Sequence, residues 1–121
     1  MAISGVTGSK ADLVNGTYAP TGELHNGKTL FRKVNDPDKW LRYCTNGWWA
    51  VSSTSNKDAN NNLCSAHSVE TDLAHPALAK TWTVYEVDKW EVKHGVKVEV
   101  RTLVLCNYLL LIGFDPFLVV S

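Results

Sequence analysis

Apolar and polar residues alternate along most of the chain with a period of two. In residues 96–101, three valines alternate with Lys97, Glu99 and Arg101. Because successive side chains of a strand point to opposite faces, this alternation predicts a strand with one apolar and one charged face. Five further segments are rich in β-branched and aromatic residues, and we expect strands at 29–34, 39–45, 48–53, 81–87 and 89–93.

Residues that favour turns separate the expected strands. They are Asn15-Gly16, Asn26-Gly27, the Asp-Pro-Asp segment 36–38, Asn46-Gly47 and His94-Gly95. Asn46-Gly47 is the preferred pair for a two-residue type I′ turn, so we expect a hairpin there. Short strands at this spacing predict an all-β fold, an antiparallel meander that closes as a small barrel or folds as a sandwich. We expect at most one short helix, near residues 73–80.

Two of the expected hairpins share an aromatic pattern. The segments "WLRY" (40–43) and "WAV" (49–51) return later as "WTVY" (82–85) and "WEV" (90–92). Aromatic pairs on neighbouring strands stabilise a hairpin by up to roughly 1 kcal/mol each. The repeat is therefore explained by two hairpins that solve the same packing problem, and it does not require a duplicated gene.

The overall composition indicates one ordinary globular domain. The chain has 121 residues, of which 45% are hydrophobic and 20% charged, a balance that excludes a disordered chain. Its net charge is zero and it has no run of basic residues, so we expect no nucleic-acid partner. Cys44, Cys64 and Cys106 are far apart in the sequence, which favours free thiols in a reducing intracellular compartment. We also expect no signal peptide, because the first residues lack a basic segment followed by an apolar one.

The last part of the chain, "LVLCNYLLLIGFDPFLVVS" (103–121), is the most apolar. Its uncharged run is shorter than the roughly 20 residues of a membrane-spanning helix, so we expect no spanning segment. We predict a β module over residues 1–101 and an apolar C-terminal extension over 102–121. Three interpretations of the extension are open. It is an extra strand of the same sheet, which we favour up to about Ile112. Otherwise it is an arm that docks on a partner chain, or sequence foreign to the domain. As an arm, it would make contact through Leu109, Leu111, Phe114, Phe117 and Leu118.

The spacing of tryptophans and turns resembles that of a known kind of module. The matching residues are Asn15-Gly16-x-Tyr18, Pro20-Thr21, Glu23, Asn26-Gly27, Phe31-x-Lys33, Asp38-x-Trp40-Leu41-x-Tyr43, Trp49-x-Val51, Lys57, Trp82-x-Val84 and Trp90. With these residues, the segment 1–100 resembles a roughly 90-residue Trp-rich repeat module of large uncharacterised proteins from algae, oomycetes and other protists. The resemblance implies a β-rich interaction or display module without enzymatic activity. The chain departs from the pattern because it carries one copy and continues past Val100.

Catalytic and metal-binding patterns are incomplete in this sequence. Cys64 and His67 could form a dyad, but no third group is placed beside them, so a partly buried and inert cysteine is favoured. With His75 they supply three zinc ligands where a structural site needs four. The alternation of Asn, Asp and Asn in 56–60 imitates a calcium loop but lacks its glycine and its final glutamate. We therefore expect no catalytic residue, no metal and no cofactor.

Trp48 and Trp49 are the most informative aromatic residues, since neighbouring side chains on a strand point to opposite faces. The resemblance places Trp49 in the core, which leaves Trp48 for the other face. Trp48 then either contacts a partner or lies flat on the polar loop 52–62.

Three functions follow from these patterns. The leading hypothesis is a non-enzymatic interaction module that binds another protein or itself, as a subunit or linker of a larger assembly. The second is a carbohydrate-binding module, in which Trp48 stacks on a sugar ring beside Asn56, Asp58 and Asn60. The third is a small enzyme of unknown reaction, which would need a pocket with perturbed titratable groups.

Overall fold

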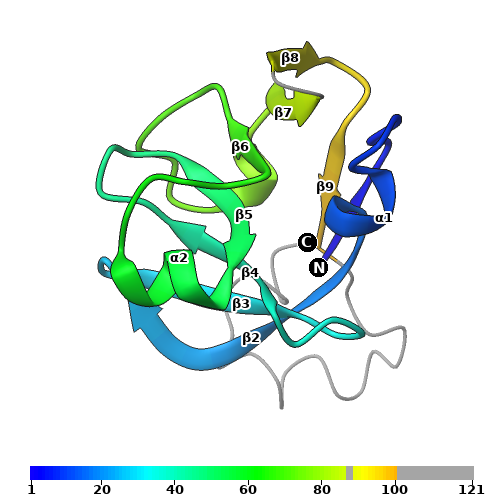
Figure 1. Cartoon of the computed structure of the whole chain (residues 1–121). Coiled ribbons are helices and arrows are strands. Elements are labelled where there is room, and N and C mark those ends of the chain that lie inside the picture. Colours follow the sequence, from blue (N-terminus) through cyan, green and yellow to red (C-terminus); the bar gives the residue numbers. More distant parts are fainter. Residues whose placement is uncertain (87–88, 101–121) are drawn as a thin grey trace, which may run out of the picture.

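The computed structural model describes residues 1–86 and 89–100, which form a nine-stranded antiparallel sheet with two short α-helices (Figure 1). This architecture confirms the prediction of an all-β meander. The strands are β1 Ala2–Ser4, β2 Gly16–His25, β3 Lys28–Lys33, β4 Lys39–Tyr43, β5 Trp49–Ser53, β6 Ala66–Ser68, β7 Trp82–Glu86, β8 Lys89–Lys93 and β9 Lys97–Glu99. The helices are α1 Ala11–Val14 and α2 Thr54–Ala59, and a single 3₁₀ turn, η1, spans Pro76–Leu78.

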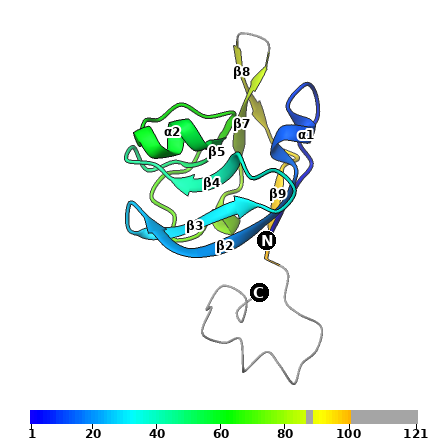
Figure 2. The ribbon, with the colours of Figure 1, turned by 60° about the horizontal axis from the view of Figure 1, so that its bottom comes forward.

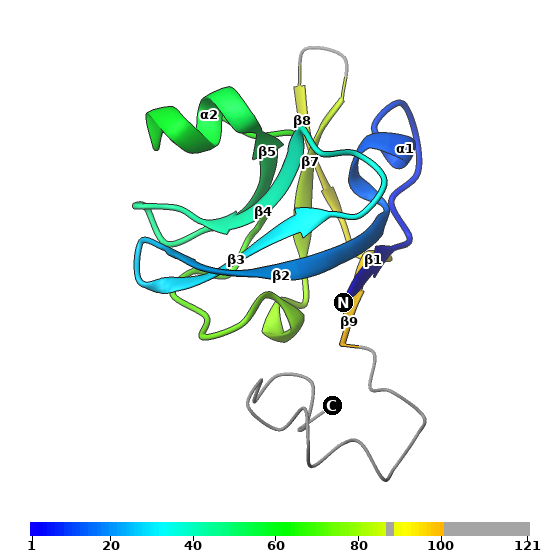
Figure 3. The same ribbon diagram turned by 90° about the horizontal axis from the view of Figure 1, so that it is seen from below.

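The sheet is curled, and its strand order shows this, since two strands that are consecutive in sequence lie at its opposite edges. The strand order is β8-β7-β6-β5-β4-β3-β2-β1-β9, so β8 and β9 are the two edge strands. Only residues 94–96 separate them, and a chain of this length spans at most about 14 Å from Lys93 to Lys97. Figures 2 and 3 show β9 continuing from β8 to pair with β1. The two edges of the sheet therefore come close together, as in a small barrel.

A glycine contact marks the place where the two edges approach. Gly5, which follows β1, has a φ of +88° and lies against the backbone of Gly95. Any Cβ atom on Gly5 would collide with the carbonyl oxygen of Gly95. A side chain at this position would therefore be strained and would also force the edges apart.

The core lies on the inner face of the curled sheet. Trp49 is 1% exposed, and its indole N–H donates to the carbonyl oxygen of Leu73 at 2.8 Å, so the buried ring keeps a hydrogen-bond partner. The inward residues alternate along each strand, as a half-buried sheet requires. They include Tyr18, Phe31, Leu41, Trp49, Val51, Ala66, Trp82 and Val84.

The turn between β4 and β5 is not the predicted type I′ turn. A type I′ turn needs positive φ at both central residues, and here only Gly47 has one, of 94°. The amide of Gly47 donates to Cys44, and the loop holds three residues between Cys44 and Trp48, whose backbones are also hydrogen-bonded. The Asn46 side chain accepts the amide hydrogen of Trp48 at 3.2 Å, which favours this wider loop.

The type I′ geometry occurs instead at the tip of the β2–β3 hairpin. There Asn26 has a φ of 51° and Gly27 a φ of 85°. The flanking residues His25 and Lys28 pair directly, so the loop has two residues.

The helices also differ from the prediction of at most one, near residues 73–80. That segment forms only the η1 turn, whereas α2 lies in the polar stretch expected to be a loop. Ser53 caps α2 by accepting the amide hydrogen of Asn56 at 3.3 Å, and Asn60 ends it in the left-handed region. No residue of α2 is buried, so an apolar helical period could not reveal it.

The predicted C-terminal extension 102–121 lies outside the described residues. This includes the five expected contact residues of that segment, Leu109, Leu111, Phe114, Phe117 and Leu118. Among the residues that the structure describes, no helix has the length and apolar character needed to cross a bilayer.

Candidate functional site

Aromatic side chains gather on the outer face of β6, β7 and β8, which is turned away from the core. The ring of Trp48 stacks on His67, with centroids 3.6 Å apart and planes 7° from parallel. Trp90 lies 5.1 Å from the His67 ring and 5.3 Å from the Tyr85 ring. Val92 is on the same face of β8 as Trp90. We name Trp48, His67, Tyr85, Trp90 and Val92 the outer aromatic strip.

Strand register brings the members of the strip together. His67 on β6 is opposite Thr83 on β7, and Thr83 is opposite Val92 on β8. Tyr85 is directly opposite Trp90 in the β7–β8 hairpin. Because the neighbouring Val84 is fully buried in the core, Tyr85 has to point to the outer face.

Strand β8 turns its apolar side chains away from the core. Trp90 is 45% and Val92 54% exposed. The alternate residues, Lys89, Glu91 and Lys93, stand on the face that carries the core, and both lysines form ion pairs with Glu91, at 3.2 and 3.0 Å. Large apolar side chains exposed next to one another are typical of a surface that binds a partner.

His67 adds a neutral ring to the middle of the strip. Its Nδ1 lies 2.8 Å from the carbonyl oxygen of Ser68, which can only accept, so Nδ1 carries the proton. Burial lowers the pKa of His67, and the hydrogen bond to Ser68 opposes that effect less strongly. The ring is therefore uncharged at neutral pH, and the strip presents no charge to a partner.

A groove of about 440 Å³ adjoins the strip at one rim of the sheet, where β4 and β6 begin and β5 and β7 end. We name it the rim groove. Tyr85 and Trp90 belong both to the strip and to this groove. The other lining residues are Leu13, Lys39, Ser52, Ser53, Asn56, Asn62, Leu63, Cys64 and Ser65.

Arg42 holds the loop that forms one wall of the groove. This side chain is fully buried on the outer face of β4. Its Nε donates to Ser52 Oγ at 2.6 Å, and one terminal nitrogen donates to the carbonyl oxygens of Asn61 and Leu63, at 2.7 and 3.2 Å. These bonds fix the backbone on both sides of Asn62, so Arg42 positions the wall although it does not line the groove.

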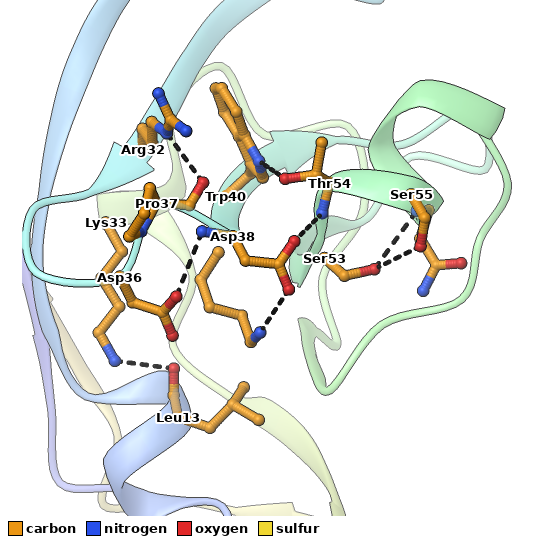
Figure 4. Close-up of polar contacts among 12 residues, drawn as sticks. Leu13, Arg32, Lys33, Asp36, Pro37, Asp38, Trp40, Ser53, Thr54 and Ser55 are labelled. Atoms are coloured by element: carbon orange, nitrogen blue, oxygen red, sulfur yellow. Dashed lines mark hydrogen bonds and ion pairs between the residues drawn. The ribbon is translucent and has the colours of Figure 1, made fainter.

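The turn at residues 36–38 holds another part of the wall (Figure 4). Asp38 accepts the amide hydrogen of Thr54 at 3.1 Å and pairs with the Lys39 ammonium at 3.1 Å. The bond from Thr54 is the main cause that lowers the pKa of Asp38. Asp36 accepts the amide hydrogen of Asp38 and shapes the turn. Asp38 therefore ties the β3–β4 turn to the start of α2, and Asp36 stabilises the turn itself.

The structure separates the residues that were predicted to bind a sugar with Trp48. Trp48 packs on His67, and of the three polar residues only Asn56 lines the rim groove. Asp58 forms an ion pair with Lys57 at 2.6 Å. Asn60 caps α2 and exchanges two side-chain hydrogen bonds with Asn26, at 2.9 and 3.1 Å. Asp58 and Asn60 therefore have structural partners away from the groove.

Tyr85 and Trp90 were not among the predicted site residues. The signal that could have identified them is the repeated aromatic pattern, in which Thr83 and Val84 replace Leu41 and Arg42. The apolar residue comes first in β4 and second in β7, so the two strands bury opposite sides of the repeated pattern.

Burial changes the properties of Cys64 and His67, the two groups considered for catalysis. Burial raises the pKa of the Cys64 thiol to about 12, so the thiol stays protonated and is a poor nucleophile at neutral pH. Nδ1 of His67 is committed to Ser68, and Trp48 covers one face of its ring. In residues 1–86 and 89–100, no three His, Cys, Asp or Glu side chains are grouped so that they could hold a metal ion.

Comparison with known proteins adds no relative. No protein-family model, no curated protein and no solved structure matches the chain. The resemblance to Trp-rich repeat modules therefore stays a prediction, and the function has to be inferred from the site itself.

Proposed function

We propose that the chain is a non-enzymatic interaction module that binds another protein through the outer aromatic strip, as a subunit or linker of a larger assembly. The observation that supports this function is the outward orientation of the Tyr85–Trp90 pair, with Val92 beside it. Tyr43 and Trp49 form the same cross-strand pair on the inner face, where Trp49 is buried in the core and the partly buried Tyr43 packs against it. A pair of this kind stabilises most when water is excluded from it, and a partner surface would exclude water from the outer pair.

The strip has the properties of the centre of a protein interface. Tryptophan and tyrosine are enriched there, and charged residues are depleted. Contacts with His67 and Tyr85 hold the Trp90 ring, so little side-chain freedom would be lost on binding. Since His67 is neutral at neutral pH, burying the strip requires no desolvation of a charge.

Self-association of the full chain tests the proposal first, because a second copy of the chain is a partner that can be tested directly. Sedimentation velocity over a range of concentrations should reveal an assembly. The variants Trp90→Ser and Val92→Ser should weaken it, by about tenfold or more for Trp90. Leu24→Ser is the matched control, because Leu24 is an apolar residue of β2 that is 71% exposed and lies outside the strip.

A dye that fluoresces on apolar surfaces provides the second readout in the same variants. Its signal should fall in Trp90→Ser and Val92→Ser and stay unchanged in Leu24→Ser. A chain that is monomeric at every concentration, with the same dye signal in all three variants, would contradict the proposal.

A further inference from the structure

We propose that the rim groove is a binding site for a neutral sugar ring, which stacks on Trp90 and is hydrogen-bonded by the side-chain amides of Asn56 and Asn62. This site goes beyond the protein-binding function of the strip. It also places the contact with a sugar on Trp90 rather than on Trp48, which does not line the groove.

The aromatic side of the groove suits the apolar face of a pyranose. Trp90 is half exposed and forms an edge-to-face contact with Tyr85, with ring planes 69° apart. This contact fixes the direction of the exposed indole face. The C–H groups of a sugar ring carry a small positive charge, and the face of an aromatic ring is negative, so the two attract.

The lining of the groove also supplies hydrogen-bond donors, the side-chain amides of Asn56 and Asn62. Asn56 Oδ1 accepts from the Asn61 side chain at 3.2 Å, and Asn62 Oδ1 accepts from the Thr45 hydroxyl at 3.4 Å. These bonds orient both amides. Within the part of the chain that the structure describes, no hydrogen bond uses the Nδ2 groups of Asn56 and Asn62. Each Nδ2 can therefore donate to a sugar hydroxyl, which accepts two hydrogen bonds.

The charges around the groove select a neutral ligand. Lys39 is the one lysine, arginine, aspartate or glutamate among the described lining residues, and its ammonium is already paired with Asp38 at 3.1 Å. The Cys64 thiol has a pKa of about 12 and is uncharged at neutral pH. A phosphate, a sulfate or a uronic acid would therefore enter the groove without a free cation to pair with.

The size of the groove agrees with a small ligand. Small-molecule sites have volumes of roughly 300–1,000 Å³, and the groove, at about 440 Å³, falls within that range. Its walls are anchored by buried or paired groups, Arg42 on the 61–63 side and Asp38 on the α2 side. The site is thus largely formed before a ligand binds, which reduces the entropy lost on binding.

Titration calorimetry on the full chain tests this site with a panel of neutral oligosaccharides from β-glucan, mannan and chitin. Sulfated and uronic-acid oligosaccharides and inorganic phosphate form the charged arm. We expect binding in the neutral arm only. Asn62→Ala should weaken it by about fivefold to tenfold, through the loss of one hydrogen bond. Trp90→Ala should weaken it by at least about tenfold, and Trp90→Phe by less, because Phe keeps an aromatic face.

Val92→Ser is the matched control, since Val92 belongs to the strip and does not line the groove. It should weaken self-association and leave sugar binding unchanged, whereas Asn62→Ala should do the reverse. The two proposals can therefore fail separately. Circular dichroism confirms that each variant is folded.

Three results would overturn the sugar site. The first is that no neutral oligosaccharide binds, or that a charged one binds more tightly. The second is that binding survives both Trp90→Ala and Asn62→Ala. The third is that Asn62→Ala weakens self-association and not sugar binding, which would make the groove part of the protein interface.

Discussion

The β4–β5 and β7–β8 hairpins contain the same aromatic pair in the same register and turn it to opposite faces. Tyr43 is opposite Trp49, with ring centroids 5.5 Å apart, and Tyr85 is opposite Trp90 at 5.3 Å. Trp49 is 1% exposed and Trp90 is 45% exposed. The valines that follow differ in the same way, since Val51 is fully buried and Val92 is mostly exposed.

The residues between the aromatic ones decide which face is buried. In β4 the apolar Leu41 shares the inner face with Tyr43, and the polar Arg42 points outward. In β7 the order is reversed, because Val84 is apolar and Thr83 is polar. Burying Val84 therefore sends Tyr85, and with it Trp90, to the outer face. A local pattern of aromatic residues predicts a hairpin, but the alternating residues beside it predict the side that is buried.

The two hairpins also differ in what covers their outer faces. Trp40 of β4 points outward but is only 8% exposed, because Arg32 and Lys57 lie over its ring at 4.6 and 4.5 Å. Its indole N–H donates to Thr54 of α2 at 2.8 Å (Figure 4). Trp90 lacks comparable cover in the described chain and keeps nearly half of its surface exposed. Among the residues that the structure describes, the outer face of the β4–β5 hairpin is covered, whereas the β7–β8 hairpin keeps Trp90 and Val92 exposed.

The largest expected effect is a difference in the free energy of unfolding between variants of Trp49 and of Trp90. Trp49→Ala should reduce the free energy of unfolding by about 3–5 kcal/mol, because it empties a buried site. Trp90→Ala should reduce it by less than about 1 kcal/mol, since the ring is partly exposed. Urea denaturation followed by circular dichroism measures both values. Equal losses would contradict the inverted arrangement of the hairpins.

Replacement of Arg42 should have the next largest effect. Arg42→Ala removes the donor for two carbonyl oxygens of the 61–63 loop, and we expect a loss of about 2–3 kcal/mol in the free energy of unfolding. Amide hydrogen exchange of Leu63 should accelerate as the loop loses its support. Arg32→Ala is the control, because Arg32 is exposed, and it should cost at most about 1 kcal/mol. Unchanged exchange at Leu63 would show that Arg42 does not position the groove wall.

The strip should also make the fold sensitive to acid. Burial lowers the pKa of His67 below its usual value of 6.5, so the unfolded chain binds this proton more readily than the folded one. Stability should therefore fall as the pH decreases through about 6.5 and below, and His67→Phe should remove part of that decrease. Thermal melting from neutral to acidic pH measures it, with the exposed His94→Asn as control. A pH dependence that is identical in His67→Phe and the unmodified chain would exclude His67 as its source.

The smallest effect is expected at Asn60. Asn60→Gly keeps the left-handed end of α2 and loses only the exposed amide pair with Asn26, so stability should change by about 0.5 kcal/mol or less. Sugar binding should stay unchanged, because Asn60 does not line the groove. A loss of sugar binding in this variant would show that Asn60 contributes to the binding site.

Strands with clear alternation could be predicted from the sequence, and the others could not. The segments 29–34, 39–45, 48–53, 81–87 and 89–93 correspond to β3, β4, β5, β7 and β8. Strand β2 was missed because Pro20 and Gly22 interrupt it and its pairing with β3 shifts register beyond Pro20, so no period of two appears. β1 and β6 have three residues each, and no alternation extends into the residues beside them. β9 is equally short, but the alternation over 96–101 predicted it.

The candidate site was predictable only in part. The adjacent Trp48 and Trp49 correctly indicated one buried ring and one on the outer face. The exposure of Tyr85 and Trp90 depends on what covers the outer face of a hairpin. In the β4–β5 hairpin, α2 and the 61–65 loop cover Trp40 and Arg42, and both segments are distant from these residues in the sequence. Single-strand patterns carry no information about such long-range contacts.

Solvent exposure of the individual indole groups tests the central claim most directly. A soluble paramagnetic agent broadens the NMR signal of an indole N–H in proportion to its exposure, and spectra of dilute and concentrated chain can be compared. We expect Trp90 to be broadened strongly in the dilute sample and protected in the concentrated one, with Trp49 protected in both. If Trp90 is as protected as Trp49 in the dilute sample, or equally exposed at every concentration, the outer aromatic strip is not the surface through which the chain self-associates.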